Sequence, residues 1–105
     1  GNNKIILCER GIRSFDPYTR NTLDLSAVPI MKRETGLPVV VDPSHGTGIR
    51  SLVRIMSMAA IAAGADGLML EAHTHPELSI SDKEQTIDIE ELGEIIMNMN
   101  KMISK

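Results

Sequence analysis

Three short apolar runs that each end in polar residues constrain the fold of this chain more than any other feature. They lie at residues 5–8, 39–42 and 67–71. Continuous apolar runs of this length are typical of strands that are buried on both faces of a parallel sheet. Their spacing of about 30 residues is the usual size of a βαβ unit. The pattern therefore predicts an α/β fold in which right-handed helical crossovers join parallel strands.

The segments between and after these runs carry the signals of helices. A helix is expected over about residues 26–36, where a glycine and then a proline give a stop signal. A second helix is expected over residues 52–63. A third is expected over 89–103, because Asp88 and Glu91 have the spacing of a capping box at its start. The apolar stripe of this last helix consists of Ile89, Leu92, Ile96, Met99 and Ile103.

Loops are expected in the remaining segments, which are rich in glycine, proline and polar residues, at 9–20, 43–48 and 73–85. Two architectures fit this order of elements: a small doubly wound sheet, or three consecutive βα units of a barrel. Residues 1–105 form a single domain in either case, because no linker, low-complexity tract or repeat divides them.

Charge and composition argue against several classes of function. The formal net charge is −3 without a basic stripe, so a nucleic-acid partner is not expected. No apolar run approaches membrane-spanning length, so a membrane partner is not expected either. Cys8 is the only cysteine, which rules out an internal disulfide and favours a reducing, cytoplasmic compartment. Because Cys8 lies within the first apolar run, we expect a buried and inert thiol.

Polar residues follow all three expected strands at the point where each strand ends. The pairs are Glu9 with Arg10, Asp42 with His45, and Glu71 with His73. The carboxyl ends of parallel strands meet at one edge of a sheet, and α/β folds bind their ligands at that edge. A functional site is therefore expected there.

Three of the polar residues suit a metal ion. Imidazole and carboxylate ligands at His45, Glu71 and Asp82 would fit divalent Mn, Fe, Co or Zn. In the alternative interpretation His45 caps a turn and both acids are solvated, and the spacing alone leaves both interpretations open. Glu71 is the more informative acid, because an unpaired carboxylate at the edge of a buried strand is costly.

Two arginines are candidates for holding phosphate groups. Arg10 directly follows the first strand, where its guanidinium could bind a phosphate by paired hydrogen bonds or form an ion pair with a nearby carboxylate. Arg50 follows the glycine-containing segment 46–48, which leads into a helix. Helix starts of this kind commonly bind phosphate, although the glycines could also serve a tight turn alone.

Five motifs, in order along the chain, carry a resemblance to a known family. They read Ile-Leu-Cys-Glu-Arg-Gly at 6–11, Thr-Arg-Asn-Thr-Leu-Asp at 19–24, Val-Asp-Pro-Ser-His at 41–45, Glu-Ala-His at 71–73 and Ile-Ser-Asp at 80–82. Together they resemble the smaller, microbial type of 3-deoxy-D-arabino-heptulosonate 7-phosphate (DAHP) synthase over essentially the whole chain. The sister family, 3-deoxy-octulosonate 8-phosphate synthase, shares Cys-Glu-Arg-Gly and the strand-end histidine. The Ile12-Arg13 step and residues 20–24 favour the DAHP branch.

The resemblance implies a metal-dependent transferase built on a (β/α)8 TIM barrel, with this chain as the C-terminal part, barrel strands six to eight. Enzymes of that family condense phosphoenolpyruvate with erythrose 4-phosphate, the first step of the shikimate pathway of aromatic amino acid biosynthesis. The implied metal ligands are His45, Glu71 and Asp82. Arg10 is implied to bind the phosphate of phosphoenolpyruvate and Arg50 the aldose-phosphate end, with Arg10 and His45 as the catalytic residues.

A chain that begins at the sixth strand lacks five barrel strands and the metal-binding cysteine of the family, which Cys8 does not match. We therefore expect the isolated chain to be inactive unless complementary chain is supplied. Its two open sheet edges are expected to pair with other copies, giving a homo-oligomer. The alternatives are a fragment of the sister synthase and a non-catalytic α/β binding module.

Overall fold

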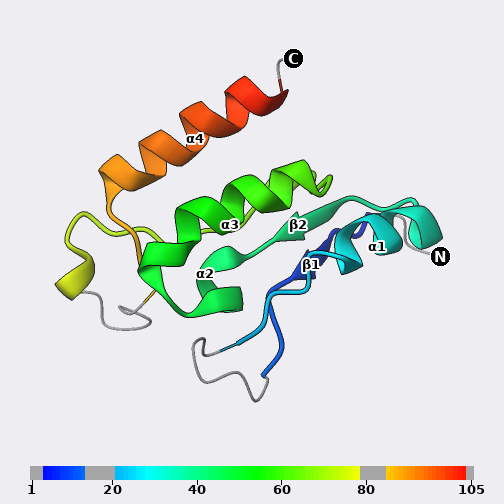
Figure 1. Cartoon of the computed structure of the whole chain (residues 1–105), viewed down its shortest axis with the longest axis horizontal. Helices are drawn as coiled ribbons and strands as arrows, with labels where there is room; N and C mark the ends of the chain where they lie inside the picture. The colour runs from blue at the N-terminus through cyan, green and yellow to red at the C-terminus, as the bar shows by residue number, and fades with distance from the viewer. Residues whose placement is uncertain (1–3, 14–20, 79–84, 104–105) are drawn as a thin grey trace.

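A computed structural model describes residues 4–13, 21–78 and 85–103, and its centre is a sheet of three parallel strands (Figure 1). The strands are β1 (Leu7–Glu9), β2 (Val39–Val41) and β3 (Gly67–Leu68), in the spatial order β1-β2-β3. The register places Val40 beside Cys8 on one side and beside Gly67 on the other. The predicted parallel α/β arrangement is confirmed, with strands shorter than the apolar runs.

The helices of the described residues are α1 (Ala27–Thr35), α2 (Pro43–Thr47), α3 (Arg50–Ala62), α4 (Ile89–Ile103) and the short 3₁₀ turn η1 (Pro76–Leu78). α1 ends at Gly36, whose φ of 70° is the left-handed conformation that favours glycine. At the start of α4, the main-chain N–H of Glu91 donates to Asp88 Oδ1 at 2.7 Å, which is the expected capping interaction. The bounds predicted for α1 and α4 are thus confirmed, and α3 begins two residues earlier than predicted.

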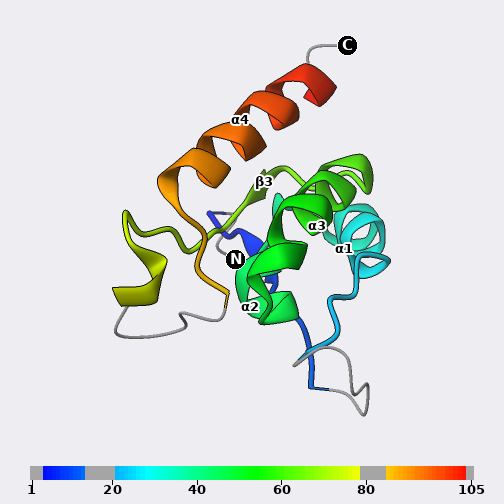
Figure 2. The ribbon, with the colours of Figure 1, turned by 60° about the vertical axis from the view of Figure 1, so that its left-hand side comes forward.

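Helices α1 and α3 pack on the same face of the sheet. Val39 and Val41 of β2 form one core cluster with Val28 of α1 and Ala60 of α3. A second cluster joins α3 to α4 and is extended by Leu68 of β3. Figure 1 shows α4 beside α3, and Figure 2 shows that α4 also lies beside β3. Consecutive strands with helices on one face are the arrangement of a barrel segment, whereas a doubly wound sheet carries helices on both faces.

No part of residues 4–13, 21–78 and 85–103 covers the opposite face of the sheet. Ile6 is 64% exposed and Met69 is 53% exposed, and Cys8 is exposed between them. The expectation that the first strand is buried on both faces, with Cys8 in the core, is therefore wrong. Alternate side chains of a strand point to opposite faces, and the helices cover only one of these faces.

The segment after β2, expected to be a loop, contains the short helix α2. Asp42 caps this helix by accepting the main-chain N–H of His45 at 2.9 Å, and Pro43 occupies the first helical turn. Gly48 ends it with a φ of 68°. Pro76 likewise begins the η1 turn inside the expected loop 73–85, because a proline is compatible with the first position of a helix.

The expected apolar stripe of α4 is only partly buried. Ile95, which is not in that stripe, is the fully buried residue of the helix, whereas Ile89, Ile96 and Ile103 are exposed. A groove of about 330 Å³ lies between β3 and α4 and is lined by apolar residues of both elements, including Leu68, Leu92 and Ile96. Among the described residues, no helix combines the length and the apolar character needed to cross a membrane.

Candidate functional site

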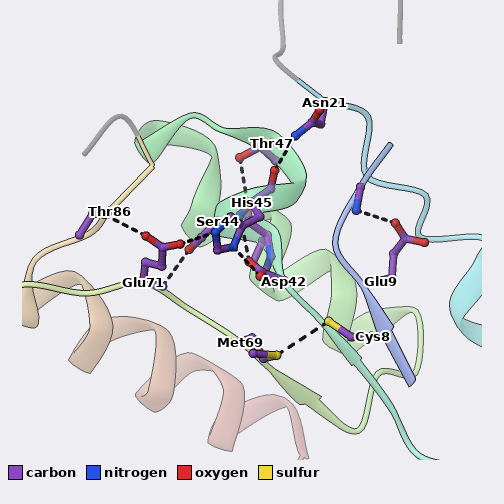
Figure 3. Close-up of polar contacts among 12 residues, drawn as sticks. Cys8, Glu9, Asn21, Asp42, Ser44, His45, Thr47, Met69, Glu71 and Thr86 are labelled. Carbon is purple, nitrogen blue, oxygen red and sulfur yellow. Dashed lines mark hydrogen bonds and ion pairs between the residues drawn. The ribbon is translucent and has the colours of Figure 1, made fainter. Parts of the chain in front are cut away.

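The ends of β2 and β3 bring three polar side chains together (Figure 3). The Nδ1 atom of His45 lies 2.7 Å from Oδ2 of Asp42. On the other side of the ring, Nε2 lies 2.5 Å from Oε1 of Glu71. Asp42 is buried, and His45 and Glu71 are partly buried. The expected meeting of polar residues from neighbouring strand ends is confirmed for these two strands.

The α2 turn holds this arrangement through its own main chain. Asp42 accepts the N–H of His45 through Oδ1, so both the backbone and the ring of His45 contact the same carboxylate. The fully buried Ser44 accepts the main-chain N–H of Glu71 at 3.1 Å. The turn that positions His45 therefore also fixes the chain at Glu71.

Glu71 is supported from a second direction by the segment that leads into α4. The hydroxyl of Thr86 donates to Glu71 Oε2 at 3.4 Å. The N–H of Ile87 donates to the carbonyl of Glu71 at 2.9 Å, and Ile87 accepts the N–H of His73. Residues 85–87 thus return alongside the end of the third strand. Asp82, the third metal ligand expected from the sequence, lies outside the described residues.

The two carboxylates change the acid–base behaviour of His45. Partial burial of the ring acts to lower its pKa. The hydrogen bond and charge of Asp42, together with the charge of Glu71, outweigh that effect and raise the pKa of His45 above its ordinary value. A positive charge on the ring, from a proton or a bound cation, is therefore stabilised between Asp42 and Glu71.

Arg10 lies at the end of β1 with an exposed side chain. Its charge reaches the site, because it acts to lower the pKa of both His45 and Cys8.

Desolvation is the main cause that raises the pKa of the Cys8 thiol, and the charge of Asp42 adds to it. The thiol of Cys8 lies 3.8 Å from the sulfur of Met69. A raised pKa disfavours the reactive thiolate, as expected for an inert cysteine.

The loop after β1 packs on the α2 turn. Asn21 donates from its side-chain amide to the carbonyl of His45 at 3.0 Å. Gly11, with a φ of 89°, approaches the backbone of Gly46 closely. This contact brings the end of β1, and with it Arg10, toward the other two strand ends.

Arg50 forms ion pairs with carboxylates other than those that contact the His45 ring. Its Nε donates to Glu91 Oε1 at 2.8 Å, and its Nη2 donates to Asp88 Oδ2 at 3.1 Å and to the same Glu91 oxygen. These carboxylates lie at the start of α4, so Arg50 joins α3 to α4. His75 and Glu77, also outside the site, are exposed and face each other at 3.8 Å.

The donor atoms of the site fit part of a metal-binding set. In residues 4–13, 21–78 and 85–103, no three His, Cys, Asp or Glu side chains are grouped to hold a metal ion. The Nε2 atom of His45 and Oε1 of Glu71 nevertheless converge, while Asp42 occupies the other ring nitrogen. An imidazole and a carboxylate, with a second carboxylate behind the imidazole, are typical of transition-metal and zinc sites. The pair therefore fits as two ligands.

Three supporting residues were not predicted from the sequence: Asp42 as the partner of the His45 ring, and Ser44 and Thr86 as the partners of Glu71. The signal for Asp42 is an aspartate followed by proline and, three positions on, by histidine, which is the spacing of a helix cap. Thr86 carries no comparable signal, because its contact depends on where residues 85–87 lie against the end of the third strand.

Comparisons with known proteins agree with this architecture. The model of the DAHP synthetase I family matches residues 1–105. A phospho-2-dehydro-3-deoxyheptonate aldolase of Thermotoga maritima is 55% identical over 102 residues, which are 97% of this chain and 30% of that protein. A 2-dehydro-3-deoxyphosphooctonate aldolase of Desulfosudis oleivorans is 35% identical over 107 residues, covering 91% of this chain and 38% of that protein.

Two solved structures from Thermotoga maritima are similar over almost the whole chain. The crystal structure of its DAHP synthase superposes with a TM-score of 0.94 at 53% identity and covers 98% of this chain but 30% of that chain. A truncated form of the 3-deoxy-D-arabino-heptulosonate 7-phosphate synthase gives a TM-score of 0.95 at 54% identity, covering 99% of this chain and 40% of that one. This chain thus spans between 30% and 40% of the relatives described here. It belongs to the DAHP synthetase I family and forms three βα units of a (β/α)8 barrel.

Proposed function

We propose that this chain supplies part of the active site of a DAHP synthase, which condenses phosphoenolpyruvate with erythrose 4-phosphate as the first step of the shikimate pathway. The observation that carries the proposal is the convergence of His45 and Glu71 at the carboxyl ends of two parallel strands. Membership of the DAHP synthetase I family supports it, as does the higher identity to a heptonate aldolase than to an octonate aldolase.

The proposed metal ligands are His45 through Nε2, Glu71 and Asp82. The pairing of the first two supports this assignment, and the donor set suits Mn, Fe, Co or Zn. A bound divalent cation would act there as a Lewis acid on the aldehyde of the sugar phosphate. Titration of Mn2+ into the chain tests the assignment: we expect binding that is lost in His45→Ala. Equal binding by both proteins would exclude His45 as a ligand.

Arg10 and Arg50 are the proposed phosphate ligands. Arg10 is exposed at the catalytic edge of the sheet, so its guanidinium is accessible to the phosphate of phosphoenolpyruvate and would offset its charge. The proposal for Arg50 at the aldose-phosphate end competes with its ion pairs to Asp88 and Glu91. A substrate role for Arg50 requires that a phosphate share the guanidinium with these carboxylates or displace them.

The test of the activity is a chimera in which this chain replaces the matching segment of the Thermotoga maritima relative. We expect the chimera to consume phosphoenolpyruvate only when erythrose 4-phosphate is supplied. His45→Ala should abolish consumption. His75→Ala, which changes an exposed histidine outside the site, should not. The proposal would be refuted by a folded chimera that does not consume phosphoenolpyruvate when either erythrose 4-phosphate or arabinose 5-phosphate is supplied.

The same assay distinguishes DAHP synthase activity from that of the sister family, 3-deoxy-octulosonate 8-phosphate synthase. This second candidate function is supported by the 35% identity to an octonate aldolase. A chimera that prefers arabinose 5-phosphate to erythrose 4-phosphate would assign the segment to the octulosonate branch. Because the supporting strands come from a heptonate aldolase of Thermotoga maritima, a preference for arabinose 5-phosphate could come only from the grafted segment.

The isolated chain is proposed to have no turnover and to associate with copies of itself, in the cytoplasm that its single thiol favours. The sheet face that no helix of the described residues covers supports self-association, as do the outer edges of β1 and β3, which pair with no further strand in that part of the chain. Light scattering over a wide concentration range tests it. Ile6→Lys, on the open face, should reduce the average mass. The equally exposed Ile55→Lys on α3 should not. A monodisperse monomer at all concentrations would contradict the proposal.

A further inference from the structure

We propose that Asp42 is a positioning residue that fixes the tautomer of His45, so that Nε2 is the ring nitrogen offered toward Glu71. The inference deepens the proposed metal site and rests on it for its role in function. Its geometric basis is that the two oxygens of one buried carboxylate contact one residue. Oδ1 accepts the His45 main-chain N–H at 2.9 Å, and Oδ2 lies 2.7 Å from Nδ1 of the same residue.

The chemistry of the pair determines which nitrogen carries the proton. An ionised carboxylate can only accept hydrogen bonds, so Asp42 and Glu71 compete for the single proton of a neutral His45 ring. Asp42 has the stronger hold on the ring, because it is buried and its other oxygen accepts the His45 main-chain N–H, whereas Glu71 is partly buried and its other oxygen accepts from Thr86. The proton is therefore assigned to Nδ1. The lone pair is then on Nε2, which is the atom that lies 2.5 Å from Glu71 Oε1. A metal ion binds the nitrogen that has no proton, and the hydrogen bond at the other nitrogen selects it.

The position of Asp42 makes this selection part of the fold. Asp42 is the N-cap of α2, and Pro43 occupies the first helical turn. The capping residue of α2 therefore also contacts the ring of His45, which is itself a residue of α2. Ser44, which lies between Asp42 and His45 in the sequence, accepts the main-chain N–H of Glu71. The same turn therefore positions the His45 ring and the residue that faces its Nε2 atom.

Asp42→Asn is a sharp test because asparagine caps helices about as well as aspartate does. Its carbonyl oxygen can still accept the main-chain N–H of His45. Its NH₂ group would then face Nδ1, which must become an acceptor and leave the proton on Nε2. The variant thus keeps the cap and inverts the tautomer.

The ring nitrogens of a ¹⁵N-histidine-labelled chain report the tautomer by NMR, without metal, in alkaline solution. His73 supplies an internal standard. Its Nδ1 accepts the main-chain N–H of His75 at 2.8 Å, so its proton must be on Nε2. We expect the His45 ring, identified by its loss in His45→Gln, to show the opposite tautomer to His73. In Asp42→Asn it should show the same tautomer as His73.

Two spectra would overturn the inference: a neutral His45 that carries its proton on Nε2 in the wild-type chain, or a tautomer that Asp42→Asn leaves unchanged. The first needs no variant, so poor folding of Asp42→Asn does not remove the test. Mn2+ titration gives a second readout, with affinity expected to fall about 10- to 100-fold in Asp42→Asn. Equal affinity would overturn the positioning role. No binding by the wild-type chain would instead count against the proposed metal site, while the tautomer still decides the role of Asp42.

Discussion

Gly11 and Gly46, from the segments that follow neighbouring strands, approach each other so closely that a Cβ atom on Gly11 would lie 2.7 Å from the Cα atom of Gly46. Both partners in this contact are backbone, so neither can move aside as a flexible side chain could. The contact seats the end of β1 on the α2 turn that carries His45.

We expect Gly11→Ala to destabilise the chain more than Gly64→Ala. Both glycines have positive φ, 89° and 103°, so both alanines carry the left-handed cost of about 1–2 kcal/mol. A Cβ on Gly64 meets no atom within 4 Å, whereas that on Gly11 meets Gly46. The steric overlap should add about 1–3 kcal/mol. Urea unfolding measures both losses, and equal losses would contradict the close approach.

The second prediction concerns the ion pair between Arg50 and Glu91. A double-mutant cycle with Arg50→Met and Glu91→Gln should give a coupling energy near the upper end of the range for partly exposed pairs, about 1 kcal/mol. Arg54 and Glu94 join the same two helices at 3.4 Å but are more exposed, so their coupling should be smaller. If the Arg50 cycle gives no coupling, the role of this arginine in joining α3 to α4 is wrong.

Much of the fold was predictable because the strands and helices carry local signals. The stop signal of α1, and the apolar periodicity and cap of α4, are local to each segment, and the bounds of both helices agree with the prediction. The exposure of Cys8 was not predictable in this way. An apolar run shows that a strand can be buried on both faces, but only the packing shows which faces are covered. The α2 helix was missed because its signal, an aspartate before a proline, also suits an ordinary turn.

The site was predictable to the level of its principal side chains. His45 and Glu71 follow parallel strands, and topology alone brings such positions together. The roles of Ser44 and Thr86 depend on distances between segments remote in sequence, which no local pattern reports. Arg50 illustrates the same limit, because its carboxylate partners come from the start of a helix that only the tertiary fold brings near.

The third prediction concerns acid stability and Asp66. The hydrogen bond from the Val39 N–H, and then that from Lys32, lower the pKa of Asp66 below its ordinary 3.8. Its contribution to stability is therefore fully present above that value and is lost as the pH falls through the folded-state pKa. We expect the stability difference between wild type and Asp66→Asn to shrink between about pH 5 and about pH 2.

Glu34→Gln is the control for Asp66, because it also removes one negative charge but from an exposed side chain that pairs with its neighbour Arg33. Chemical denaturation at a series of pH values measures both variants against the wild type. A difference for Asp66→Asn that stays constant with pH would show that Asp66 has the same pKa in the folded and unfolded states.

The fourth prediction concerns Gln85, which lies beside Thr86 where the chain returns to the site. Its side chain is 1% exposed, and neither its amide nitrogen nor its amide oxygen has a hydrogen-bond partner in the part of the chain that the structure describes. A buried polar group without a partner costs about 1–3 kcal/mol. Gln85→Met keeps a similar unbranched shape without the amide, so we expect it to stabilise the chain by about 1 kcal/mol or more.

Thr86→Val is the matched contrast to Gln85→Met, because Thr86 is equally buried but donates to Glu71 Oε2. Removing that hydroxyl should destabilise the chain. The two neighbouring substitutions, both from a polar to an apolar residue, are therefore expected to change the free energy of unfolding in opposite directions. Urea midpoints at one pH compare them directly. Destabilisation by Gln85→Met would mean that the amide is satisfied in solution, for which a buried water is the simplest partner, and the unpaired state would be refuted.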